Sequence, residues 1–171
     1  FFSAEMFAKL KAAVEKKEFP YKDYRQTGSV RVLDGVENHI ESVLNIIPNI
    51  AQIRKKKYSI VVDAVGGAGR EALPQLLDRL GCRVVPLYCE ESPRGFPRAP
   101  EPTPSALREF GALVKKEKAA AGFALDPDAD RLVVGSPKQG TLNEEYTVPL
   151  SLLGFLSAHK NDVKGKACQA D

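Results

Sequence analysis

The sequence has few of the residues that build zinc sites, disulfide frameworks or membrane spans. It contains two histidines and three cysteines among 171 residues, and Cys82, Cys89 and Cys168 form no Cys-x-x-Cys pair. Neither histidine neighbours a cysteine, which argues against a zinc site, and an odd number of scattered thiols is typical of a reducing cytosol. No stretch approaches the roughly 18 apolar residues of a membrane span, and there is no signal-peptide pattern. We therefore expect a cytoplasmic protein with no membrane partner.

Charge is also modest, with a net value of +3. A balance this small does not by itself indicate nucleic-acid binding. The one basic run, Arg54-Lys55-Lys56-Lys57, lies directly before an apolar stretch and is typical of a solvated helix end. We expect no nucleic-acid partner. The apolar fraction of 43% is enough to fill a core.

The order of the apolar patterns predicts an α/β fold. Helical periodicity marks residues 4–18 and 36–47, and a short strand is expected at 30–33. Strand and helix patterns then alternate, which predicts a three-layer α/β/α arrangement with a mixed, mainly parallel sheet of about four strands. The fourth strand should pair antiparallel, because too few residues separate it from the third for a crossover. The four predicted strands are 58–63, 82–87, 122–125 and 132–135.

The most informative stretch joins the last two predicted strands, and we call residues 126–131 the acidic loop. Asp126, Asp128 and Asp130 occupy alternate positions, so one local conformation can aim all three carboxylates at one point. Converging negative charges repel unless a cation lies among them, and all-oxygen ligands suit Mg²⁺ or Ca²⁺. Arg131 follows directly and is able to bind a phosphate oxygen. A solvated acidic turn without any metal remains an alternative.

A calcium loop of the EF-hand type also begins Asp-x-Asp-x-Asp. That loop needs glycine at position six and glutamate at position twelve, where this sequence has Arg131 and Pro137. The EF-hand hypothesis therefore fails. Mg²⁺ takes few protein carboxylates and completes its shell with water or phosphate, which fits the acidic loop better.

A glycine turn, residues 66–69, supports a competing hypothesis. Gly67-Ala68-Gly69-Arg70-Glu71-Ala72 follows a strand, opens a helix and matches Gly-x-Gly-x-x-Ala, and Glu90 lies where a ribose-binding acid is expected. This pattern predicts a dinucleotide site, although glycines also simply let a helix and a strand pack closely. Pro74 should disturb the helix, since proline is tolerated only near the first turn. A phosphatase of the haloacid-dehalogenase type, with Asp126 as nucleophile, lacks its later metal-binding acidic pair and is discounted.

Several motifs in order resemble the α-D-phosphohexomutases, the family of phosphoglucomutase, phosphomannomutase and phosphoglucosamine mutase. Residues 124–131 resemble its metal loop, with Pro127 in place of the usual glycine. Residues 60–69, 80–90 and 95–102 resemble other parts of the family's second domain. The resemblance covers roughly residues 36–158.

The resemblance implies an enzyme of four domains that interconverts hexose 1-phosphate and 6-phosphate through a phosphoserine in its first domain. Mg²⁺ would bridge that phosphoserine and Asp126, Asp128 and Asp130, and Arg131 would lie beside the transferring phosphoryl group. Residues 1–34 would be the end of domain 1 and a linker, 35–160 domain 2, and 161–171 a tail toward domain 3. The phosphoserine motif and the sugar-binding and phosphate-binding loops of the later domains are missing. We therefore expect one excised domain that binds Mg²⁺ weakly and is inactive alone, with a stand-alone nucleotide- or phosphate-binding module as the alternative.

Overall fold

The computed structural model describes residues 2–17, 19 and 21–158. The chain divides into two compact units, Phe1–Leu33 and Asp34–Asp171. Within the described residues, no helix is long and apolar enough to cross a membrane.

The first unit contains one helix, α1 (Ala4–Lys16), and a short 3-10 helix, η1 (Tyr24–Gln26). Ser3 caps α1, since its hydroxyl accepts a hydrogen bond from the Met6 backbone amide at 3.2 Å. The strand predicted at residues 30–33 was wrong, because this segment has no regular structure. Val30 and Val32 are almost fully exposed there, so among the described residues of the first unit these β-branched side chains have no neighbouring strand to pack against.

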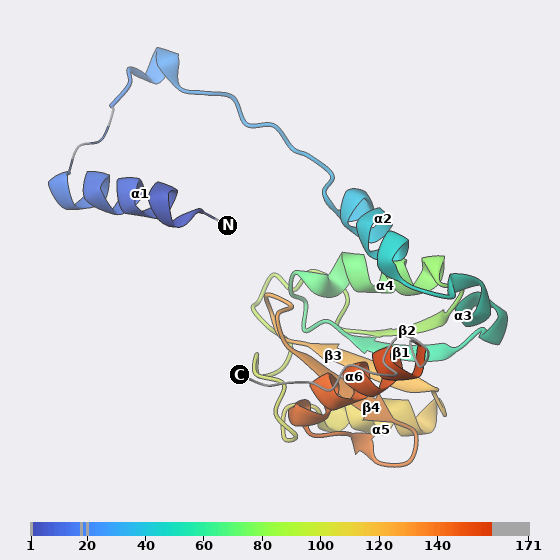
Figure 1. Cartoon of the computed structure of the whole chain (residues 1–171). Helices are drawn as coiled ribbons and strands as arrows, with labels where there is room; N and C mark the ends of the chain where they lie inside the picture. The colour runs from blue at the N-terminus through green and yellow to red at the C-terminus, as the bar shows by residue number, and fades with distance from the viewer. Residues whose placement is uncertain (1, 18, 20, 159–171) are drawn as a thin grey trace, which may run out of the picture. The chain divides into compact units, whose positions relative to one another are not determined.

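The second unit is built around a five-stranded sheet in the order β2-β1-β3-β4-β5 (Figure 1). β1 pairs parallel with β2 and β3, whereas β3–β4 and β4–β5 pair antiparallel. The mixed sheet, with its first three strands parallel and the fourth antiparallel, was therefore predicted correctly, but with one strand too few. β5 has only two residues, too short for an alternating pattern to be visible in the sequence. The strands are β1 (Ser59–Asp63), β2 (Arg83–Leu87), β3 (Ala121–Leu125), β4 (Leu132–Ser136) and β5 (Gly140–Thr141).

Helices cover both faces of the sheet, which confirms the three-layer α/β/α prediction (Figure 1). On one face, α4 packs on β1 and β2, and α2 packs on α4. On the other face, α5 packs on β1, β3, β4 and β5. The helices are α2 (Val36–Ile46), α3 (Ile50–Lys56), α4 (Gly69–Arg79), α5 (Arg108–Lys116), the 3-10 helix η2 (Glu144–Tyr146) and α6 (Thr147–Ala158).

The alternation of side chains along β1 divides the core into two clusters. Ile60 and Val62 face α2 and α4, whereas Val61 faces α5 together with Phe110. Both faces of a central parallel strand are thus buried, which explains why its sequence is a continuous apolar run. The carboxyl ends of β1 and β3 lie side by side, with Asp63 paired to Ala124, and this edge carries the acidic loop.

Pro74 lies inside α4, so the prediction that it belongs only near the first helical turn was wrong. The helix continues to Arg79 because the neighbours of Pro74 pack against the core, Leu77 fully and Leu73 and Leu76 in part. Tertiary packing here compensates for the backbone hydrogen bond that proline cannot donate.

Candidate metal centre

The acidic loop connects β3 to β4, which pair antiparallel in the sheet. Leu125, the last residue of β3, pairs with Leu132, the first residue of β4. The chain reverses between them through Ala129, whose φ of 63° is left-handed and whose amide donates to the Asp126 carbonyl at 3.2 Å. The reversal keeps the three aspartates on a short, closed loop.

The loop brings Asp126, Asp128 and Asp130 together. Each can offer a carboxylate oxygen such that all three oxygens lie within 4.8 Å of one another. Asp126 is 6% exposed, whereas the other two side chains are open to solvent. Among the described residues, no other group of three or more acidic, histidine or cysteine side chains converges in this way.

Hydrogen bonds within the loop give the carboxylates different proton affinities. Burial raises the pKa of Asp126, but the Arg131 amide and hydrogen bonds with Asp128 and Asp130 outweigh it, so the net pKa is lowered. The pKa of Asp130 is raised, first by its hydrogen bond to Asp126 and then by the charges of Asp128 and Asp126. Asp130 therefore binds a proton more readily than Asp126 does.

This arrangement fits a hard divalent cation. Three carboxylate oxygens lie within 4.8 Å of one another, and negative charges this close favour a cation among them. Oxygen ligands of Mg²⁺ lie about 2.0–2.1 Å from the ion, and the exposed side chains of Asp128 and Asp130 have solvent around them in which to adjust. Because the remaining positions face solvent, the ion would keep room for water or a phosphate oxygen.

Arg131 lies at the end of the loop and is tied to it at two points. Its backbone amide donates to Asp126 Oδ1 at 3.1 Å, and its Nε lies 4.0 Å from Asp130 Oδ1. Its Nη1 forms an ion pair with Glu101 in the proline-rich segment, residues 92–104. The side chain is still 45% exposed, so the guanidinium is accessible to an anion beside the carboxylates.

The glycine turn lies against the acidic loop. A Cβ on Gly67 would come within 2.4 Å of the Pro127 carbonyl oxygen, and one on Gly69 within 2.3 Å of Leu125 Cδ1. The Ala68 amide donates to the Pro127 carbonyl at 2.8 Å. The glycines therefore allow close packing of the turn against the loop, and the Ala68 amide at the start of the helix is already bonded to the loop rather than open to a pyrophosphate.

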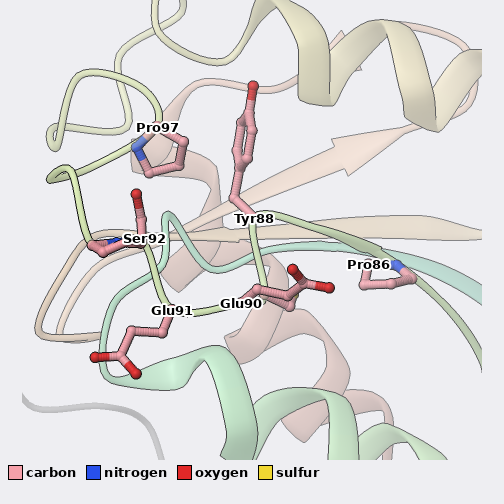
Figure 2. A pocket seen from close by; sticks show the side chains of 8 residues that line it. Pro86, Tyr88, Glu90, Glu91, Ser92 and Pro97 are labelled. Carbon is pink, nitrogen blue, oxygen red and sulfur yellow. The ribbon is translucent and has the colours of Figure 1, made fainter.

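Glu90, the acid considered for ribose binding, lines a pocket of about 330 Å³ beyond the end of β2. Figure 2 shows the Tyr88 ring and the Glu91 carboxylate on opposite sides of the segment that forms this pocket. Tyr88 donates a hydrogen bond to Glu109 at 2.6 Å, which together with burial raises its pKa. No residue of the glycine turn lines the pocket, so the features that suggested a dinucleotide site do not form one crevice.

Two buried residues next to the loop were missed by sequence reasoning. The side chains of Arg98 and Asp63 are 6% and 1% exposed and form a two-fold ion pair, with N–O distances of 2.8 and 3.0 Å. Arg98 also donates to the Leu125 carbonyl at 2.7 Å. Both residues lie in stretches that resemble the phosphohexomutases, but nothing in the sequence pairs them across 35 positions.

Comparison with known proteins agrees with the geometry. Residues 37–139 match the family model described as phosphoglucomutase/phosphomannomutase, alpha/beta/alpha domain II. A phosphoglucomutase/phosphomannomutase of Thermococcus kodakarensis is 35% identical over 117 residues, covering 68% of this chain and 25% of the relative. A phosphomannomutase/phosphoglucomutase of Pseudomonas aeruginosa is 33% identical over 131 residues, covering 76% of this chain and 26% of the relative.

A solved structure shares the fold. It is a phosphoglucomutase/phosphomannomutase family protein from Burkholderia thailandensis, with a TM-score of 0.65 and 23% identity over 92% of this chain. The match covers 32% of that structure, so the present chain spans about a quarter to a third of these relatives. The family model matches well over half of the 171 residues, and the chain therefore belongs to the phosphoglucomutase/phosphomannomutase family, as its second, α/β/α domain.

Proposed function

We propose that this chain is the metal-loop domain of a phosphosugar mutase that interconverts hexose 1-phosphate and hexose 6-phosphate. The observation that carries the proposal is the convergence of three carboxylate oxygens within 4.8 Å at the carboxyl edge of the sheet. Family membership supports the reaction class, since the two curated relatives are named as phosphomutases. The phosphoserine that donates the phosphoryl group would lie in a part of the protein outside this chain.

In this proposal Asp126, Asp128 and Asp130 hold Mg²⁺. The ion would neutralise negative charge on the phosphoryl oxygens during transfer, which is the main requirement of phosphoryl-transfer catalysis. Asp126 supplies the fixed ligand, because it is buried and its Oδ1 accepts the Arg131 amide. Asp128 and Asp130 would supply the two exposed ligands.

Arg131 would bind an oxygen of the same phosphoryl group. Its ion pair with Glu101 keeps the guanidinium next to the loop while the site is free of phosphate. A planar guanidinium can contact two phosphate oxygens at once, so it positions the group as well as neutralising it. The ion pair is exposed and contributes little free energy, so the Arg131 guanidinium can leave Glu101 for a phosphate oxygen at little cost.

The partners in this proposal are the hexose phosphate substrate and the other domains of the same protein, in a cytoplasmic setting. Residues 1–34 would belong to the end of domain 1 and its linker, residues 35–160 to domain 2, and the tail 161–171 would lead toward domain 3. The tail lies outside the described residues. Because the nucleophile lies elsewhere, the chain alone should hold a divalent ion weakly and turn nothing over.

A Mn²⁺ titration of the 171-residue chain, followed by electron paramagnetic resonance, tests the metal site. We expect one weak Mn²⁺ site per chain, from which Mg²⁺ displaces Mn²⁺. Asp130→Asn should clearly weaken the affinity, and the control Asp78→Asn, at an exposed position of α4, should not. Unchanged affinity in Asp130→Asn would reject the site. Turnover of glucose 1-phosphate by the purified chain would reject its dependence on the other domains.

Thermal stabilisation by NAD(P) would favour the nucleotide-binding alternative, and we expect none.

A further inference from the structure

Arg98 has the environment of a residue that is fixed in place. Its side chain is 6% exposed and its guanidinium donates five hydrogen bonds, which equals the number of N–H groups that arginine carries. Two bonds reach the Asp63 carboxylate and a third reaches the Leu125 carbonyl. The other two hold its own segment, through the carbonyls of Ala99 at 2.9 Å and Pro100 at 3.3 Å.

These bonds join three parts of the chain at the base of the acidic loop. Asp63 ends β1, Leu125 ends β3, and Arg98 belongs to the proline-rich segment. The Leu125 carbonyl lies in the same peptide plane as the amide of Asp126, the first residue of the loop. A hydrogen bond of 2.7 Å to that carbonyl therefore fixes the direction in which the loop leaves the strand.

Asp63 supports the loop from a second side. Its Oδ1 also accepts the Val65 amide at 2.9 Å, and Val65 has a left-handed φ of 49°, which is unusual for a β-branched residue. The turn that Val65 begins carries Ala68, whose amide donates to the Pro127 carbonyl. The ion pair between Arg98 and Asp63 is thus bonded directly to Leu125, the residue before Asp126, and is linked through the turn to Pro127, the residue after it.

We propose that Arg98, acting with Asp63, is a positioning residue that sets the orientation of the three metal-binding carboxylates. This inference rests on the proposed function, because it assumes that the acidic loop binds a divalent ion. Arg98 does not contact that ion itself. Lysine cannot replace it, since an ammonium group has three donors and no planar fork to span the carboxylate and the Leu125 carbonyl together.

The test compares the 171-residue chain with Arg98→Lys and with the control Arg83→Lys. Arg83 is an exposed arginine on β2 that contacts Ser59 and Glu117. Two properties are measured: hydrogen exchange of the backbone amides of residue 126 and residues 128–131 without metal, and Mn²⁺ affinity. In Arg98→Lys we expect faster exchange confined to the acidic loop and glycine turn, and an affinity about 10–100-fold weaker, as for loss of an outer-shell partner. Arg83→Lys should change neither.

Wild-type loop exchange and Mn²⁺ affinity in a folded Arg98→Lys chain would overturn the inference. If Arg98→Lys does not fold, Asp63→Asn replaces it with the same two outcomes, because asparagine keeps an acceptor for the Val65 amide. If the wild-type chain binds no Mn²⁺, the proposed function fails. The amide exchange then decides separately whether Arg98 orders the loop.

Discussion

Replacing Gly67 by alanine places a methyl group against the backbone of the acidic loop. The new Cβ would lie 2.4 Å from the Pro127 carbonyl oxygen and 2.7 Å from its Cα. Both are backbone atoms, so no side-chain rotation relieves the overlap. Either the glycine turn or the acidic loop has to move, and the hydrogen bond from Ala68 to Pro127 lies at the same contact.

The size of the effect follows from this geometry. An added methyl group in a well-packed site costs about 1–3 kcal/mol of unfolding free energy. Loss of the hydrogen bond to Pro127 would add about 1 kcal/mol, which favours the upper part of that range. Because Pro127 lies between Asp126 and Asp128, a shift of its backbone also separates two of the three carboxylates, and Mg²⁺ affinity should fall.

Urea denaturation gives the unfolding free energy of Gly67→Ala, and Mn²⁺ titration gives its metal affinity. The control is Gly154→Ala in α6, where an added Cβ meets nothing within 4 Å. Alanine in an open helical position should stabilise the chain by about 0.5–1 kcal/mol and leave metal binding unchanged. Wild-type stability and wild-type affinity in Gly67→Ala would refute the proposed contact between the turn and the loop.

Three further substitutions test the site and the core. Asp128→Asn should weaken Mn²⁺ binding by more than about 10–100-fold, which is the loss expected for a residue that only supports a metal ligand. Its unfolding in urea should be nearly unchanged, because the side chain is exposed. An Mn²⁺ affinity equal to that of the wild type would contradict the assignment of Asp128 as a ligand. Phe110→Ala should lower the unfolding free energy by about 3–5 kcal/mol, since Phe110 is fully buried under the sheet; a loss below about 1 kcal/mol in urea denaturation would contradict that packing. Tyr88 has a pKa raised by its hydrogen bond to Glu109, so the stability it adds is present below the ordinary tyrosine pKa of about 10 and is lost as pH rises through the folded-state pKa. Urea unfolding between about pH 8 and 11 should show that loss in the wild type and less of it in Tyr88→Phe, and identical pH profiles would contradict it.

Regular periodicity made most of the fold predictable. β1 is buried on both faces, so its sequence is a continuous apolar run. α4 is buried on one face, so its leucines recur at helical spacing. Features that depend on tertiary packing could not be predicted from periodicity. α4 continues through Pro74 because the neighbouring residues pack against the core. β5 is a strand of two residues defined only by its pairing with β4.

The candidate site divides in the same way. The alternation of Asp126, Asp128 and Asp130 is local, so spacing alone predicted that their carboxylates would meet. The support beneath them is not local: Arg98 meets Asp63 across 35 positions, and Arg131 meets Glu101 across 30. Such pairs depend on how the proline-rich segment folds back over the sheet edge, which no periodicity encodes. The glycine turn shows a related limit, because its pattern indicated close approach but not which group approaches.

Anomalous diffraction from crystals of the 171-residue chain soaked in Mn²⁺ tests the metal site most directly. We expect one strong peak among the carboxylates of Asp126, Asp128 and Asp130, with Asp126 as a ligand and the Arg131 side chain beside it. A peak elsewhere, or no peak while Mn²⁺ binds in solution, would contradict the assignment of the acidic loop as the metal centre.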